Sequence, residues 1–219
     1  MAIRAFLFDF DGLILDTETA SRAGWEWLYR EHGHELPQEK WELVVGTVGA
    51  WNPMDHLEEL VGGPLERGEL NDRRVVHELS LLEAERLRPG IAEYLAAADR
   101  HSLKRAIVSS ASRRWIDMHL RRLERAVGWD AIITADHDER RAKPNPEMYV
   151  EALDALAIDA HEAVVFEDSP NGVRAAKDAG IFVVAVPNSV TRNYALDEAD
   201  LVVESLASLP PEELLARFS

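Results

Sequence analysis

The chain opens with the pattern of a buried strand that ends in acidic residues. Ala5 to Phe8 form an unbroken apolar run, and Asp9, Asp11 and Gly12 follow it directly. A short apolar run bounded by a turn signal is typical of a strand that is buried on both faces of a parallel sheet. The pattern therefore predicts a first strand whose carboxyl end carries two carboxylates and a turn.

Helical periodicity dominates the next segment, residues 17–86. Apolar residues recur there at helical spacing, with Asn52-Pro53 as a start signal, Gly62-Gly63-Pro64 as a stop signal and a longer helix from Glu69 to Leu87. Several helices that follow one strand without a second strand between them indicate an insertion. We therefore predict a helical domain at residues 17–86, inserted into a core domain formed by residues 1–16 and 87–219.

Strands and helices alternate after Arg88-Pro89-Gly90. The predicted strands are Arg105–Ser109, Ala131–Thr134, Ala163–Phe166, Ile181–Val186 and Leu201–Val203, and the predicted helices are Ile91–Ala98, Arg113–Val127, Pro146–Ala157, Asn171–Ala179 and Pro211–Phe218. This alternation predicts an α/β fold with a parallel sheet that is covered by helices on both faces. Ligands of such sheets bind beyond the carboxyl ends of the strands.

Polar residues stand at or just after four of these predicted strand ends. The four stretches are Asp9 to Gly12, Ser109-Ser110, Lys143-Pro144 and Glu167 to Ser169. Because the carboxyl ends of parallel strands share one edge of the sheet, we expect these side chains to converge on one pocket. Clustered carboxylates repel each other unless a lysine or a hard cation compensates them, and Mg²⁺ prefers oxygen ligands. The sequence therefore predicts a magnesium site at this edge.

The same residue types fit the transfer of a phosphoryl group. A carboxylate at a strand end can attack phosphorus, and a second carboxylate two residues later can protonate the leaving oxygen and then activate water. Asp9 and Asp11 fit these two roles. Lys143 and the hydroxyl of Ser109 would hold the phosphoryl oxygens as charge develops on them.

Taken together, the motifs identify the chain as similar to the haloacid dehalogenase (HAD) superfamily, in the branch of β-phosphoglucomutase-like phosphatases. They occur in the order of that family as FLFDFDGLILDTE, IVSS, AKPNPEMY and VVFEDSPNG, and the resemblance covers essentially the whole chain. It implies a Rossmann-like core, a helical cap domain inserted after the first motif, an aspartyl-phosphate intermediate and a Mg²⁺ cofactor.

The resemblance also implies roles for individual residues. By it, Asp9 is the nucleophile, Asp11 is the general acid and base, Ser109 is the phosphate binder of the second motif and Lys143 is the lysine of the third. The metal ligands that it implies are the carboxylates of Asp9, Asp168 and Glu167 and the backbone carbonyl of Asp11. Candidates for contact with phosphate or substrate are Gly12, Ser110, Asn171 and Trp51.

Some readings of these residues stay open. Ser109 and Ser110 are ambiguous in register by one position, and either could only satisfy backbone groups at the strand end. Asp168 could act merely as the N-cap of the helix that begins at Pro170. Trp51 is placed in a loop near Gly49, where substrate contact is one of its possible roles.

The activity itself also has alternatives. Where the mutases of this branch carry a histidine and a basic stretch in the cap, this chain has Ser21 and the residues Val45 to Gly49. We therefore favour hydrolysis of a phosphorylated metabolite over a β-phosphoglucomutase-type mutase, which stays the alternative. Asp11 argues against the dehalogenase and phosphonatase branches, and the intact set of motif residues argues against a protein that only binds a ligand.

Composition and charge limit the classes of partner that the protein can bind. The chain of 219 residues has 24 Lys and Arg against 40 Asp and Glu, a net charge of −16, which opposes binding to nucleic acid. It contains no cysteine, which excludes disulfides and thiolate metal sites. Its first apolar run is interrupted by Asp9 and resembles neither a secretory signal nor a membrane span. We expect a cytoplasmic monomer whose partner is a phosphorylated small molecule, with no nucleic-acid or membrane partner.

Overall fold

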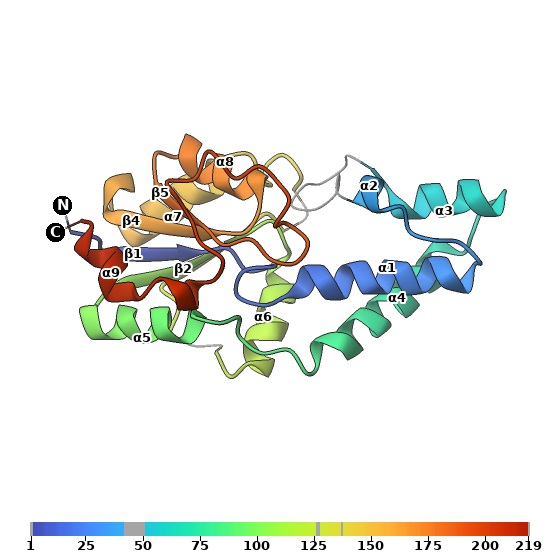
Figure 1. Ribbon diagram of the computed structural model, residues 1–219, viewed down its shortest axis with the longest axis horizontal. Helices are drawn as coiled ribbons and strands as arrows, with labels where there is room; N and C mark the ends of the chain where they lie inside the picture. Colours follow the sequence, from blue (N-terminus) through green and yellow to red (C-terminus); the bar gives the residue numbers. More distant parts are fainter. Residues whose placement is uncertain (1, 42–50, 126–127, 137, 219) are drawn as a thin grey trace.

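A six-stranded parallel sheet forms the centre of the molecule (Figure 1). The computed structural model describes residues 2–41, 51–125, 128–136 and 138–218. The sheet order is β3-β2-β1-β4-β5-β6, and the strands are β1 (Ala5–Phe8), β2 (Lys104–Ser109), β3 (Ala131–Thr134), β4 (Ala163–Glu167), β5 (Phe182–Ala185) and β6 (Leu201–Val202). Each of the five neighbouring strand pairs is parallel. The predicted α/β fold is confirmed.

Helices cover both faces of this sheet. One face packs against α5 (Ile91–His101), α6 (Arg113–Arg122), η2 (Leu206–Ser208) and α9 (Pro211–Ala216), and the other against α7 (Glu147–Leu156), η1 (Ala160–Glu162) and α8 (Pro170–Asp178). Side chains of β1 alternate between the two layers, as the period of a strand requires. Phe6 and Phe8 point into the first layer and Leu7 into the second, all fully buried. Burial on both faces explains why this strand is an unbroken apolar run.

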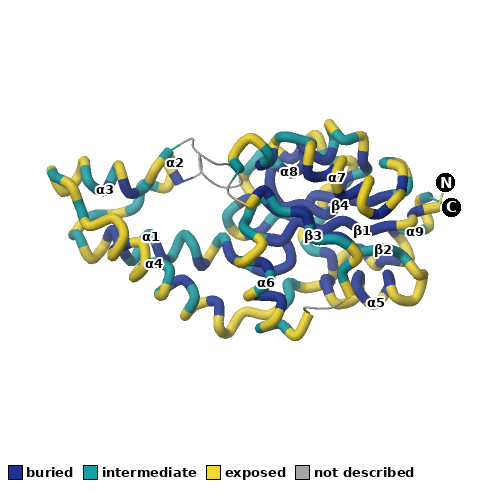
Figure 2. The backbone as a smooth tube through the Cα atoms, turned by 180° about the vertical axis from the view of Figure 1, so that it is seen from behind, coloured by how far each residue is buried: buried dark blue, intermediate teal, exposed yellow. Residues whose placement is uncertain are grey.

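A helical part of the chain projects beyond the carboxyl ends of the strands (Figures 1 and 2). It contains α1 (Thr17–Glu31), α2 (Gln38–Trp41), α3 (Pro53–Val61) and α4 (Arg67–Leu82). Its own apolar cluster consists of Leu28, Tyr29, Met54, Leu57 and Leu70. These four helices fall within the predicted insertion at residues 17–86, whose boundaries as a domain stay a prediction.

Two helices end five residues earlier than the sequence pattern predicts. The helix predicted to reach Leu87 ends at Leu82, which is buried in a core cluster of the sheet. From there the chain returns to the sheet, where the backbone N–H of Arg88 donates to Ile14 O at 2.9 Å. The helix predicted to reach Val127 ends at Arg122, because Glu124 adopts a left-handed φ of 56° that turns the chain out of the helix.

No helix in the described ranges of the chain is long and apolar enough to cross a membrane.

Candidate active site

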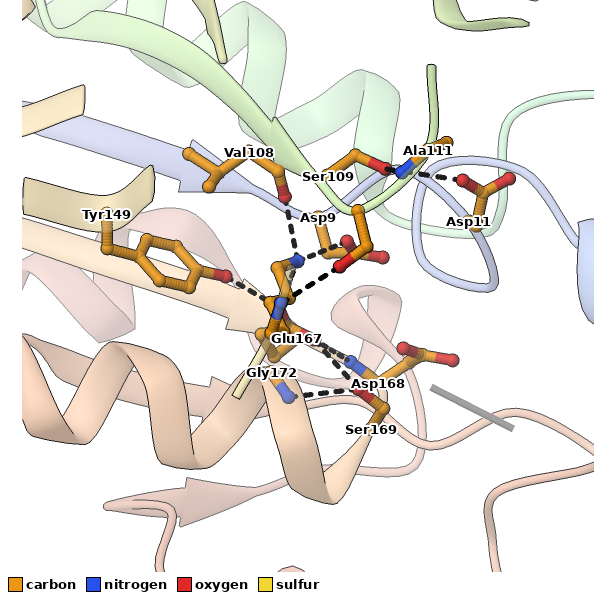
Figure 3. Close-up of polar contacts among 12 residues, drawn as sticks. Asp9, Asp11, Val108, Ser109, Ala111, Tyr149, Glu167, Asp168, Ser169 and Gly172 are labelled. Atoms are coloured by element: carbon orange, nitrogen blue, oxygen red, sulfur yellow. Dashed lines mark hydrogen bonds and ion pairs between the residues drawn. The ribbon is translucent and has the colours of Figure 1, made fainter. Parts of the chain in front are cut away.

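The four polar stretches predicted from the strand ends meet at the carboxyl edge of the sheet (Figure 3). Asp9 follows β1 directly, and its backbone N–H donates to Phe166 O at 3.0 Å. This bond continues the pairing with β4 by one residue and brings Asp9 close to the acidic end of that strand. Asp9, Lys143, Glu167 and Asp168 are all buried, with at most 6% of each residue exposed.

Lys143 connects two of these acids. Its Nζ donates to Asp9 Oδ1 at 2.5 Å and to Val108 O at 2.8 Å, and it lies 2.5 Å from Glu167 Oε1. Burial of the ammonium group lowers its pKa, but the carboxylates of Asp9 and Glu167 more than offset this effect. The pKa of Lys143 is raised overall, so the side chain is a cation at neutral pH.

The three acids form an oxygen-rich cluster that fits a divalent cation. One carboxylate oxygen of each of Asp9, Glu167 and Asp168 lies within 4.8 Å of the other two. Burial raises the pKa of Asp9 and Asp168 well above the ordinary value, and the neighbouring carboxylates add to this. Lys143 opposes these shifts, but when all three acids are ionised its single positive charge offsets only one of the three negative charges. Hard oxygen donors with this excess charge are what Mg²⁺ requires.

Glu167 is fixed from several directions in the interior. The phenol of Tyr149 donates to its Oε1 at 2.6 Å, and the backbone N–H of Asp168 donates to its Oε2 at 3.2 Å. A Cβ atom at Gly172 would lie 2.0 Å from the Glu167 carboxyl carbon, so only glycine lets α8 pack this closely. The sequence analysis missed Tyr149, although it lies in the third motif, six residues after Lys143.

Asp168 is held from the opposite side of the cluster. Its Oδ2 accepts a hydrogen bond of 2.6 Å from Asn188 Nδ2. Gly12 adopts a left-handed φ of 77°, and a Cβ atom there would lie 2.3 Å from the same oxygen. Asn188 was also missed, although it follows β5 at the same edge of the sheet. The alternative reading of Asp168 as an N-cap is wrong, because Ser169 caps α8 by accepting from Gly172 N at 3.1 Å.

The Asp11 carboxyl group lies apart from the three acids and is bound by residues around the end of β2. Ser109 Oγ donates to its Oδ2 at 3.3 Å, and Trp115 Nε1 donates to its Oδ1 at 2.8 Å. Ser109 is 1% exposed. The hydroxyl oxygen of Ser110, which is partly exposed, accepts instead from the backbone N–H of Lys143 at 3.2 Å. The two serines therefore face different groups, and Trp115 is a further residue that the sequence analysis missed.

This combination of fold and site matches a known family. Residues 3–180 match the family model of the haloacid dehalogenase-like hydrolases. The chain belongs to this family.

Similar proteins match nearly the whole length of the hydrolase. YhcW of Bacillus subtilis (strain 168) is 40% identical over 207 residues, which cover 94% of each chain. The phosphorylated carbohydrates phosphatase of Thermotoga maritima is 31% identical over 219 residues, which cover 97% of each chain. The crystal structure of CbbY from Rhodobacter sphaeroides in complex with phosphate superimposes with a TM-score of 0.76 at 28% identity, covering 94% of this chain and 96% of that chain. These similarities confirm the predicted family and the predicted enzyme class, a phosphoric monoester hydrolase.

The hydrolase also contains an arginine clamp that the sequence analysis did not identify. The guanidinium group of Arg88 donates to Gly12 O and, at 3.1 Å, to Pro187 O. The clamp thus joins the turn after β1 to the loop that carries Asn188. Burial lowers the pKa of Arg88, and the negative charge of Asp168 opposes this effect.

Two further predicted contact residues belong to the start of α8 and to the segment before α3. Asn171 is in the first turn of α8. Trp51 directly precedes the N-cap residue of α3, and its ring lies 5.4 Å from the His56 ring and 5.9 Å from Lys40 Nζ. These contacts of Trp51 are within the helical part, so its contact with substrate stays a prediction. The Val45 to Gly49 stretch lies outside the described residues.

Proposed function

We propose that the protein is a Mg²⁺-dependent phosphatase that hydrolyses a small phosphorylated metabolite through an aspartyl-phosphate intermediate on Asp9. The observation that carries the proposal is the position of Lys143, whose Nζ lies 2.5 Å from both Asp9 Oδ1 and Glu167 Oε1. A carboxylate can approach the negative oxygens of a phosphate only where cations offset their repulsion. Lys143 supplies one positive charge beside Asp9, and the acid cluster can hold a second cation.

The reaction that these residues support has two halves. In the first, an Asp9 carboxylate oxygen bonds to phosphorus, the bond from phosphorus to the alcohol oxygen breaks, and Asp11 gives its proton to that oxygen. In the second, water attacks phosphorus and gives a proton to Asp11, and the bond from phosphorus to Asp9 breaks. The products are an alcohol and inorganic phosphate, and both aspartates return to their starting states.

The residues that would hold the metal ion are those of the acid cluster. Asp9 and Asp168 supply carboxylate oxygens, Asp11 supplies its backbone carbonyl, and Glu167 lies beside them. Bound there, Mg²⁺ would offset the negative charge of the phosphoryl oxygens.

Lys143 and a serine hydroxyl would bind the phosphoryl group. The sequence analysis favoured Ser109, but its hydroxyl proton is directed to Asp11. Ser110 is partly exposed and its Oγ accepts from Lys143 N, so its own O–H is left to donate to a phosphoryl oxygen. We therefore assign phosphate binding to Ser110 and contact with Asp11 to Ser109.

The substrate class that we propose is a sugar phosphate or a similar phosphomonoester. It is supported by the Thermotoga maritima relative, which is named for phosphorylated carbohydrates. A mutase would need cations in the helical part to grip a second phosphate. Three arginines there are already paired with acids at 2.6 to 2.7 Å: Arg67 with Asp55, Arg73 with Glu31 and Arg74 with Glu78. This pairing favours hydrolysis over the mutase.

The test is phosphate release from p-nitrophenyl phosphate and from a panel of sugar phosphates and nucleotides, with and without Mg²⁺. Wild type and Asp9→Asn are measured in parallel, with Asp178→Asn on the exposed side of α8 as the matched control. We expect Mg²⁺-dependent release in wild type and Asp178→Asn, and a loss on the order of a thousandfold or more in Asp9→Asn. Turnover by purified Asp9→Asn at the wild-type rate would refute the proposal. Isomerisation of β-glucose 1-phosphate without phosphate release would establish the mutase instead.

A further inference from the structure

The Asp11 carboxyl group is held by Ser109 at the end of β2 and by Trp115 in the segment that follows. It is separate from the ion pair of Asp9 and Lys143. Its Oδ1 accepts from Trp115 Nε1 at 2.8 Å and its Oδ2 from Ser109 Oγ at 3.3 Å. Figure 3 shows the carboxylate beside Ser109 and Ala111, away from Glu167 and Asp168. Something other than the charged cluster must therefore set the orientation of Asp11.

The Trp115 ring is itself held in place. Its backbone N–H donates to Ser112 Oγ at 3.3 Å in the first turn of α6, which fixes the start of the helix. One turn later, the ring of His119 packs edge-on against the indole, with centroids 4.3 Å apart and an interplanar angle of 74°. His119 is 1% exposed, and burial lowers its pKa to about 4, so it packs here as a neutral ring.

The chemistry of the indole determines what this bond can do. An indole N–H is a donor and never an acceptor, so Asp11 Oδ1 can accept from it whether the carboxyl group is ionised or protonated. This bond occupies one lone pair of Oδ1 and thereby favours Oδ2, the oxygen next to the Ser109 hydroxyl, as the oxygen that carries a proton on Asp11. A hydroxyl group can both donate and accept, so Ser109 can follow the change in protonation at Oδ2.

We propose that Trp115 is the positioning residue for Asp11, holding Oδ1 so that Oδ2 is the oxygen that delivers and receives the proton. This inference rests on the proposed role of Asp11 as general acid and base. Trp115 acts through Asp11, and its own contact with substrate is not required. His119 supports the indole from behind and makes the contact rigid.

The substitution that tests this is Trp115→Phe, which keeps an aromatic ring but makes it smaller and removes the N–H donor. The matched control is Trp129→Phe, since Trp129 Nε1 donates to Arg125 O at 3.0 Å and its ring also packs against the core, 5.8 Å from Phe8. Both variants lose one indole hydrogen bond of similar length. Only Trp115→Phe removes a hydrogen bond from Asp11, at Oδ1.

The readout is kcat/KM for two substrates whose leaving groups differ in their need for a proton. The p-nitrophenolate ion leaves without protonation, whereas the alcohol of a sugar phosphate must receive a proton from Asp11. We expect Trp115→Phe to lower kcat/KM about tenfold or more for a sugar phosphate and less than about threefold for p-nitrophenyl phosphate. We expect Trp129→Phe to change neither. Equal losses on both substrates, or no loss on either, would overturn the inference.

A second measurement tests the hydrogen bond between Trp115 and Asp11 without relying on activity. In protein labelled with ¹⁵N on tryptophan, the indole N–H signals of Trp115 and Trp129 are assigned by their absence from the two Trp→Phe variants. We expect Asp11→Ala to shift the Trp115 signal and to speed its exchange with water, while the Trp129 signal stays in place. A Trp115 signal that does not move overturns the inference, whereas wild-type protein that releases no phosphate overturns the proposed function.

Discussion

Tyr149 donates a hydrogen bond of 2.6 Å from its phenol to Glu167 Oε1, and neither residue has any exposed surface. The same oxygen lies 2.5 Å from Lys143 Nζ, which in turn lies 5.4 Å from the centroid of the Tyr149 ring. Burial raises the pKa of Tyr149 well above its ordinary value, and Glu167 adds to this shift. The phenol is therefore a constant donor that fixes Glu167, and through it Lys143, from the side of α7.

Replacing Tyr149 by Phe removes this donor and leaves a buried carboxylate with one fewer partner. We expect the free energy of unfolding to fall by roughly 1.5–3 kcal/mol, the range for hydrogen bonds to charged groups. Tyr94→Phe is the control, because Tyr94 is equally buried and its phenol donates to a neutral acceptor, Leu209 O, at 2.8 Å. The control is expected to lose about 1 kcal/mol. Urea unfolding of both variants measures the difference, and equal losses would contradict the prediction.

Lys143→Met leaves Asp9 and Glu167 buried without their cation. Breaking a buried ion pair from one side costs on the order of 3–5 kcal/mol, so we expect a loss of unfolding free energy of this size in metal-free buffer. Lys177→Met is the matched control, since Lys177 pairs with Asp200 at 2.8 Å where both side chains are about 30% exposed. That pair is expected to contribute less than about 1 kcal/mol. If chemical unfolding finds the two variants equally stable, the buried pair does not have the role described here.

Gly12→Ala and Gly33→Ala distinguish a glycine that is required because a side chain would clash from one that is required only for its left-handed backbone conformation. Both glycines have a left-handed φ, 77° and 78°, but a Cβ atom at Gly12 would lie 2.3 Å from Asp168 Oδ2 whereas at Gly33 nothing lies within 4 Å. We expect Gly33→Ala to cost about 1 kcal/mol and to leave Mg²⁺ binding unchanged. Gly12→Ala should cost more and weaken Mg²⁺ binding at least about tenfold, because Asp168 must move. Calorimetric titration with Mg²⁺ tests this, and equal affinities would contradict it.

The buried His119 makes stability depend on pH. Burial lowers its pKa to about 4 in the folded state, while an unfolded histidine titrates near 6.5. The folded state therefore binds fewer protons, and the contribution of this group is complete above pH 6.5 and lost as the pH falls toward 4. Relative to His119→Phe, we expect wild type to lose up to about 3 kcal/mol of unfolding free energy over this interval.

The control for that measurement is His101→Phe, at the exposed end of α5. Its stability is expected to follow wild type across the same pH range. Urea unfolding at pH 7, 5.5 and 4.5 tests both variants, and parallel curves for wild type and His119→Phe would show that folding does not lower the pKa of His119.

Much of the site could be predicted because it depends on strand ends. Phe8 pairs with Ile107 on one side and with Phe166 on the other, so residues just after three different strands must lie side by side. Trp115 and Tyr149 could not be predicted in this way. Their partners are 104 and 18 residues away, and helix packing rather than strand order brings them together.

The ends of two helices could not be predicted from the sequence either. Apolar spacing continued past Leu82, but the end of α4 is set by the return of the chain to the sheet. Past Arg122, α6 is ended by a left-handed residue, and a glutamate at that position gives no signal in the sequence.

The arginine clamp has a mechanical consequence for the whole molecule. The chain passes between the sheet and the helical part twice, and Arg88 in the second passage is bonded to Ile14 O and Gly12 O in the first. It is also bonded to Pro187 O, next to the residue that holds Asp168. Both passages are thus anchored close to the sheet. Any movement of the helices relative to the sheet would therefore have to bend the chain beyond these anchors, and the acids at the strand ends would keep their spacing.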